Sequence, residues 1–87
     1  MGGGKMANQL LGKVTHYYDK IGVAIIELRD TLKAGETVKF KKGDEETEQT
    51  INSIQIEKAA VDSANKGAIV GVKTDQPVKE GTEVYKA

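Results

Sequence analysis

A single histidine, His16, is by type the residue of this chain best suited to general acid–base chemistry, because an imidazole titrates near neutral pH. It lies between Val14 and Tyr18 in an alternating segment, and side chains at every second position of a strand share one face. This spacing predicts that His16 lies on the inward, strand-packed face. We therefore interpret it as a structural, hydrogen-bonded histidine rather than as a catalytic base.

The other reactive side chains form no recognisable reaction centre. The chain has no cysteine, and one histidine leaves mainly carboxylates as metal ligands. The acidic run Asp44-Glu45-Glu46 follows a glycine and is typical of a solvated hairpin tip. No serine stands in a Gly-x-Ser-x-Gly elbow. The sequence therefore predicts a protein that is not an enzyme by itself and that has no metal or cofactor.

Tyrosine and lysine side chains supply the ingredients of a binding surface. An exposed tyrosine can stack on a nucleobase while nearby lysines contact phosphates, as in proteins that bind single-stranded RNA. The candidate surface consists of Lys13, Tyr17, Lys20, Lys39, Lys41 and Lys42. The competing interpretation, which we favour, is that the tyrosines are ordinary strand residues and the lysines form a solvated face that resists aggregation.

Length and charge limit the classes of protein that this chain can represent. Its 87 residues make one domain, and its thirteen basic and thirteen acidic residues cancel. Proteins that bind nucleic acid through phosphates usually carry a basic excess, so any RNA contact must be local. The longest apolar run, residues 23–26, is too short to span a bilayer, and no signal-peptide pattern occurs. We expect a soluble cytoplasmic protein without membrane contact.

The chain divides into a leader and a domain. Residues 1–9 begin with Met-Gly-Gly-Gly-Lys and lack apolar periodicity, so we expect a flexible leader or residues added for expression. The Gly-Gly-Gly-Lys run lacks the preceding strand and the following Ser or Thr that a phosphate-binding loop needs. Residues 10–87 are expected to form a single β-barrel domain.

Short strands and polar turns fill this domain. Residues 10–18 and 21–28 predict a hairpin joined at Asp19-Lys20. Further strands are expected at 38–41, 48–57, 68–72 and 84–86. We also expect a bend near residues 52–53 and one helical turn or irregular excursion at 58–65. Both faces of the second strand are apolar, which predicts a central position in the sheet. The expected core consists of Val14, Val23, Ile25, Val38, Phe40, Ile54, Ile56, Val70, Val72 and Val84.

One phrase, aliphatic-Lys-x-Gly-x-x-Val, occurs at residues 32–38 and again at 78–84. In each copy Gly can adopt the positive φ of a tight turn and Val can begin a strand. The segments after the two copies differ, so we interpret the phrase as one turn used twice rather than as a duplication. About six strands and no long helical period favour a sandwich or a barrel, and closure would remove the strand edges. We predict an all-β, six-stranded, Greek-key-like closed barrel.

Five phrases together resemble a known domain. In chain order they are GKV at 12–14, LKAGETV at 32–38, SIQI at 53–56, ANKGAIVGV at 64–72 and VKEGTEVY at 78–85. Their order resembles the second-domain barrel of translational GTPases, such as elongation factor Tu and bacterial-type initiation factors. They are also similar to small stand-alone elongation-factor-like proteins and to the C-terminal barrel of collagenase-like peptidases. The chain itself has no Gly-x-x-x-x-Gly-Lys-Ser/Thr loop, which excludes GTP hydrolysis by these residues.

The resemblance implies a binding module, because the barrel of that family contacts its GTPase module and, in some members, tRNA or the ribosome. The main prediction is a non-catalytic β-barrel binding module linked to translation, with tRNA, the ribosome or a translation factor as its partner. The alternative is a protein-docking accessory barrel of a larger enzyme system such as a collagenase-like peptidase, and the near-zero net charge favours it. The residues leave the oligomeric state open.

Overall fold

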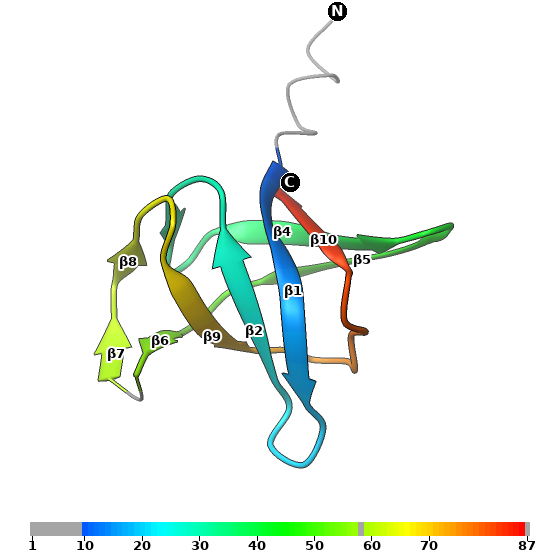
Figure 1. Ribbon diagram of the computed structural model, residues 1–87, viewed down its shortest axis with the longest axis horizontal. Helices are drawn as coiled ribbons and strands as arrows, with labels where there is room; N and C mark the ends of the chain where they lie inside the picture. The colour runs from blue at the N-terminus through cyan, green and yellow to red at the C-terminus, as the bar shows by residue number, and fades with distance from the viewer. Residues whose placement is uncertain (1–9, 58, 87) are drawn as a thin grey trace, which may run out of the picture.

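The computed structural model describes residues 10–57 and 59–86, which form ten strands (Figure 1). The strands are β1 (Leu10–Tyr18), β2 (Val23–Leu28), β3 (Leu32–Lys33), β4 (Thr37–Lys42), β5 (Glu45–Thr50), β6 (Ile54–Ile56), β7 (Ala59–Val61), β8 (Ser63–Ala64), β9 (Ile69–Lys73) and β10 (Glu83–Lys86). The predicted leader, residues 1–9, lies outside the described residues. The helical turn or irregular excursion expected at 58–65 is wrong for most of residues 59–65, which form β7 and β8, and Lys58 lies outside the described residues.

Eight of these strands form one antiparallel sheet in the order β5-β4-β10-β1-β2-β9-β6-β7, and β3 pairs with β8 in a separate two-stranded sheet. The all-β class is therefore confirmed. The six-stranded closed barrel is wrong, because the eight-stranded sheet is open, with β5 and β7 at its two edges. The first and last strands are neighbours in the sheet, with Leu10 opposite Tyr85.

The sheet stays open where β5 approaches the end of β9, and a side chain spans the gap. Gln49 Nε2 donates to the carbonyl oxygen of Lys73 at 3.1 Å, and Gln49 Oε1 accepts from the amide of Asp75 at 2.9 Å. Ile51 continues the pairing of this segment with the chain that precedes β4, because its amide donates to Glu36 O and its carbonyl oxygen accepts from the Gly35 amide. The bend expected near residues 52–53 is confirmed as the break between β5 and β6.

The predicted hairpin is confirmed as β1 and β2, but residues 19–22 connect the strands rather than two residues alone. The register of β1 against β2 shifts between Val14 and His16, where Val14 is opposite Ile26 and His16 is opposite Ile25. A one-residue bulge of this kind reverses which side chains face the core. His16 is therefore exposed, and its predicted inward position is wrong.

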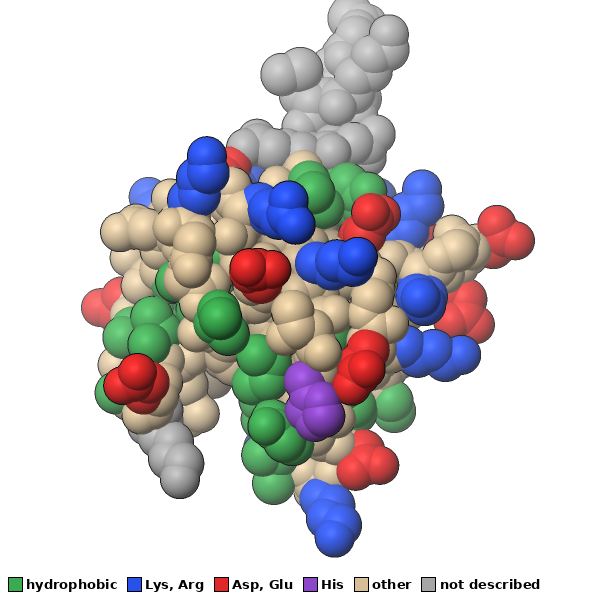
Figure 2. Space-filling model, viewed as in Figure 1, with side chains coloured by type: hydrophobic (Ala, Val, Ile, Leu, Met, Phe, Trp, Pro, Cys, Tyr) green, Lys and Arg blue, Asp and Glu red, His purple; other side chains and the backbone are tan. Residues whose placement is uncertain are grey.

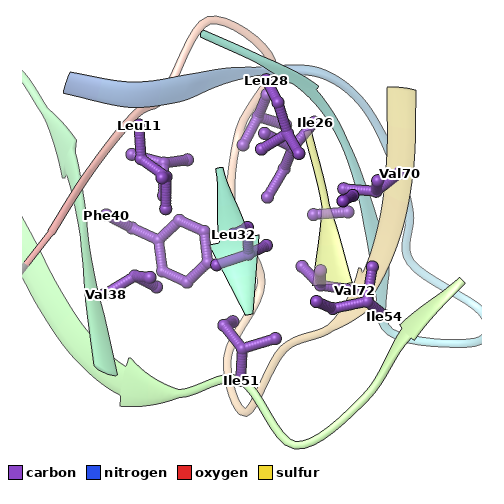
Figure 3. Packing of buried hydrophobic residues seen from close by; sticks show 14 residues of the cluster. Leu11, Ile26, Leu28, Leu32, Val38, Phe40, Ile51, Ile54, Val70 and Val72 are labelled. Carbon is purple, nitrogen blue, oxygen red and sulfur yellow. The ribbon is translucent and has the colours of Figure 1, made fainter. Parts of the chain in front are cut away.

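The core lies inside the curved sheet, where Phe40 points toward Leu32 (Figure 3). Seven predicted core residues are buried, namely Val14, Val38, Phe40, Ile54, Val70, Val72 and Val84. Three are wrong, because Val23, Ile25 and Ile56 are only partly buried. The sequence analysis missed Leu11, Ala24, Ile26, Leu28, Leu32, Ile51 and Ala64. On β2, the opposite apolar face from the predicted one points inward.

The repeated phrase forms the same turn twice, as predicted. Gly35 and Gly81 have φ of 94° and 88°, a backbone region that suits glycine. The amide of Glu36 donates to Lys33 O, and the amide of Thr82 donates to Lys79 O, each at 3.1 Å. A positive-φ glycine at the third position of such a four-residue turn is typical of type II.

Candidate functional site

A hollow of about 730 Å³ lies on the outer face of β2, β9 and β6, and we call it the apolar groove. Its walls and floor consist of Tyr18, Ile21, Val23, Ile25, Gln55, Ile56, Glu57, Gly67, Ala68, Ile69, Val70 and Gly71. Glu57 is the one charged residue in this set. The lining is thus almost wholly uncharged.

Strand alternation builds the groove from the sequence. Because β2 buries Ala24 and Ile26, it presents Val23 and Ile25 on its outer face. Gly71 on β9 is opposite Ile25 and contributes no side chain. A Cβ at Gly71 would lie 3.3 Å from Val23 Cγ1, so the glycine leaves the floor of the groove open.

The splaying of two strands forms the far wall. In the sheet, β6 pairs with β9 only through Ile54–Val72 and Gln55–Gly71. Beyond these pairs Glu57 adopts a φ of 50°, a left-handed conformation that is uncommon for residues other than glycine. The chain turns there into β7, and the β6–β7 hairpin stands apart from β2 (Figure 1). The groove lies between these elements.

Three large hydrophobic side chains are exposed within the described part of the chain, and all of them line the apolar groove. They are Tyr18, Ile21 and Ile69, with 48%, 60% and 59% of their surface exposed. Figure 2 shows hydrophobic side chains gathered beside the hollow between the β1–β2 connection and the β6–β7 hairpin. Exposed apolar residues that occur singly need no explanation, but a contiguous group marks an interaction surface.

The rest of the outer sheet face carries alternating charges. Pairs of opposing residues run across five strands, from Glu27 on β2 through Lys13, Glu83 and Lys41 to Glu46 on β5. All five side chains are exposed, and each lysine has a glutamate on either side. We call this row the charge ladder. Opposite charges across neighbouring strands stabilise a sheet modestly and keep its face solvated.

The six predicted binding residues fall into two separate groups. Lys39, Lys41 and Lys42 lie on β4, directly opposite Glu48, Glu46 and Glu45 of β5. Lys13 belongs to the charge ladder on β1. These four lysines therefore occur within a balanced array of charges rather than in a basic patch.

Tyr17 and Lys20 form the second group. They line a hollow of about 350 Å³ together with His16, Tyr18, Asp19 and Ile21. Tyr17 is half-buried and packs against the core. The structure therefore brings Tyr17 and Lys20 together but not with the lysines of β4, and RNA binding by this set stays a prediction.

The predicted hydrogen bond of His16 is confirmed. Its Nδ1 lies 2.9 Å from Glu80 Oε2, and its ring meets that of Tyr18 edge-on with centroids 4.5 Å apart. Both side chains of the His16–Glu80 pair are about half exposed or more. Across residues 10–57 and 59–86, no group of three or more His, Cys, Asp or Glu side chains could hold a metal ion.

One ionisable group on the charged face is perturbed. The Tyr85 hydroxyl donates to Glu83 Oε1 at 2.8 Å, and this hydrogen bond raises the pKa of Tyr85 above its ordinary value, assisted by some desolvation and by the negative charge of Glu83. In the described residues, no helix is long and apolar enough to cross a membrane.

Sequence reasoning missed the apolar groove. The signal was present, since Ile69 interrupts the expected face pattern of residues 68–72 and both faces of residues 23–28 are apolar. An aliphatic residue at the outward positions of two neighbouring strands indicates a covered outer face. Recognising it required the knowledge that β2 and β9 are neighbours.

The fold and the groove define a small all-β domain with one charged and one apolar outer region. The chain belongs to the peptidase family U32 C-terminal domains, whose family model matches residues 7–82. It is 41% identical over 76 residues to an uncharacterized protease of Methanocaldococcus jannaschii, a match that covers 86% of this chain and 19% of that protein. The chain thus spans about a fifth of the length of the curated relative that it matches.

Two solved structures are similar to this fold. Both are of the C-terminal domain of a predicted U32 peptidase from Geobacillus thermoleovorans, and one is a selenomethionine variant. Each has a TM-score of 0.85 and 26% sequence identity. The match to the selenomethionine variant covers 90% of this chain and 99% of the solved chain. The match to the other structure covers 91% of this chain and 92% of the solved chain.

These comparisons correct the expected translation link. They point to a U32 peptidase C-terminal domain and give no support to an elongation or initiation factor, whereas the peptidase alternative is supported. The phrases that carried the resemblance include the turns at Gly35 and Gly81 and short strands around them. Such phrases encode backbone geometry, which unrelated functions share.

Proposed function

We propose that this chain is a non-catalytic accessory domain that binds the peptidase portion of a U32-type protein. The observation that carries the proposal is the match of 76 residues, most of this chain, to about a fifth of a protease from Methanocaldococcus jannaschii. Four-fifths of that relative lies outside the match and offers room for a catalytic portion. The domain would then contribute binding or positioning rather than reacting groups.

The surface chemistry supports a protein partner. Four of the five lysines in the candidate set lie opposite glutamates, namely Lys13, Lys39, Lys41 and Lys42. Nucleic acid binding relies on local positive potential, which alternating charges weaken. A group of exposed aliphatic and aromatic side chains, by contrast, is typical of contacts between proteins.

Binding in trans tests the proposal. A homologous domain from Geobacillus thermoleovorans has been solved without the rest of its protein, which indicates that such domains fold alone. The 87-residue chain is mixed with a U32-type protein from the organism that encodes this chain. The C-terminal domain of that protein has been deleted, so that only its peptidase portion remains. We expect a one-to-one complex by light scattering and calorimetry, with a Kd of about 10 µM or tighter.

Two results would contradict the proposal. One is that two folded partners form no complex at roughly 100 µM, which corresponds to binding weaker than about −5.5 kcal/mol. The other is hydrolysis of peptides by the 87-residue chain alone. Salt-sensitive binding of RNA that depends on Tyr17 and Lys20 would instead favour the nucleic acid interpretation.

A further inference from the structure

We infer that the apolar groove is the surface on which the peptidase portion docks, and that the groove receives bulky apolar side chains from that portion. This inference rests on the proposed function and assigns a place to the contact. It makes Ile21 and Ile69 contact residues, with Tyr18 at the rim.

The first support is the uneven distribution of apolar surface. Ile21, Ile69 and Tyr18 gather in one hollow, while the outer positions of β1, β10 and β4 carry the charge ladder. An 87-residue domain with thirteen acidic and thirteen basic residues has enough charge to cover both regions. The outward charges of β2 and β9, Glu27 and Lys73, nevertheless lie outside the groove lining, and the lining positions of these two strands are uncharged.

The second support is the form of the groove. Gly71 keeps the floor open between Val23 and Ile25, and a Cβ there would fill part of the space. The volume of about 730 Å³ falls within the range of roughly 300–1,000 Å³ that is typical of small-molecule sites. Docking of aliphatic or aromatic side chains would remove the exposed parts of Ile21 and Ile69 from water.

The third support comes from the two edge strands. β5 reads Glu-Glu-Thr-Glu-Gln-Thr, and its charges discourage pairing with another chain. β7 reads Ala-Ala-Val, carries no charge and lies on the hairpin that walls the groove. Charged side chains therefore protect the edge strand β5, beside the charge ladder, from pairing with another chain. The edge strand β7, beside the apolar groove, has no such charges.

The occupant follows from what the relatives contain. The Methanocaldococcus jannaschii protease has about four-fifths of its length outside the matched segment, which is more than enough chain to cover this face. Interfaces between domains of one protein typically bury about 600–1,500 Å², of which an apolar patch forms the centre. Nucleic acid is a poor occupant, because the one charged lining residue, Glu57, would repel phosphates.

Charged substitutions in the groove test the inference in the trans-binding assay. Ile69→Asp and Ile21→Asp should each weaken the complex about tenfold or more, because a carboxylate would be desolvated at the contact. Ile69→Lys should weaken it similarly, which separates loss of apolar contact from a change in charge. Gln76→Asp is the matched control, since Gln76 is exposed, lies outside the groove lining and acquires the same charge.

The outcomes separate the two proposals. Circular dichroism and thermal unfolding first establish that each variant is folded, as expected for side chains that are about 60% exposed. Failure of the unsubstituted chain to bind contradicts the proposed function. Normal binding by all the groove variants overturns the inference and leaves the proposed function standing. Disruption of a homodimer by Ile69→Asp, with unchanged affinity for the peptidase portion, would assign the groove to a second copy and also overturn it.

Discussion

The two outer regions of the eight-stranded sheet follow opposite rules. Along the charge ladder, exposed lysine and glutamate side chains alternate across β1, β10, β4 and β5. Across β2, β9 and β6, the outward side chains are mostly aliphatic or absent, as at Gly71. The same backbone architecture therefore supports a solvated face and an apolar one. Along this row the boundary runs between β2 and β9, where Glu27 at the end of the charge ladder lies opposite Ile69.

The apolar outer region is separate from the core, because Ile21, Val23, Ile25 and Ile69 do not belong to the buried cluster. Apolar residues on the inner faces of the strands are sufficient to form the single core inside the sheet. Charged side chains on the outer face of β4 keep that face solvated. A charged residue at the position of Ile69 on β9 would do the same there. The exposed Ile69 lines the same hollow as Ile21 and does not add to the core, and partner binding is the role that we propose for it.

The largest expected effect concerns a core residue on β4, a strand whose outer face is charged. Phe40 is 3% exposed on β4, and Phe40→Ala should lower the free energy of unfolding by about 3–5 kcal/mol. Its neighbour Lys39 points outward, so Lys39→Ala should change stability by less than about 0.5 kcal/mol. Urea denaturation measures both. An unchanged midpoint for Phe40→Ala would remove this ring from the core.

A pair of variants on β2 compares the core with the apolar groove directly. Ile26 is fully buried, and Ile26→Ala should cost about 2–5 kcal/mol. Ile25 lines the groove and is partly exposed, so Ile25→Ala should cost roughly 1 kcal/mol. Chemical denaturation of both variants decides the orientation of the strand. A greater loss for Ile25→Ala would restore the face that the sequence analysis predicted.

A charge reversal tests the charge ladder itself. Lys41→Glu places a carboxylate between Glu83 and Glu46, and it should destabilise the domain by about 0.5–1 kcal/mol at low salt. Added salt should reduce this loss, because these side chains are exposed. Lys66→Glu, on a loop outside the ladder, is the control for net charge. Equal effects at the two positions would mean that the alternation has no stabilising role.

The smallest expected effect is local to Tyr85. Glu83→Gln removes the carboxylate that accepts from the Tyr85 hydroxyl, so the raised pKa of Tyr85 should fall toward its ordinary value. NMR of labelled tyrosine rings follows this titration separately from those of Tyr17 and Tyr18. A Tyr85 pKa that does not change would show that Glu83 is not its cause.

The sequence predicted those features that a few consecutive residues determine. Glycine at positions 35 and 81 requires no distant partner to form a turn, and both turns were identified. The apolar alternation of residues 68–72 likewise identified β9, and Val70 and Val72 are buried as expected. Local geometry accounts for these successes, because each signal and its outcome lie within one turn or strand.

The errors arose where the outcome depends on neighbours in space. Val23 and Ile25 alternate as regularly as Ala24 and Ile26, so composition gave no basis for choosing the inner face of β2. A bulge after Val14 then turned His16 outward, and no glycine marks it. The closed barrel was wrong because β5 and β7, the two edge strands, do not pair with each other. Strand order depends on contacts between segments distant in the sequence, such as β1 with β10. The candidate site depended on the same choice of face.

The pairing of Leu10 with Tyr85 places the entry and exit of the sheet side by side. A unit with adjacent ends can be appended to a host chain, inserted into one of its loops or permuted without unravelling the strands between them. Adjacent strand ends therefore allow such a unit to be joined to different host proteins without disturbing its sheet.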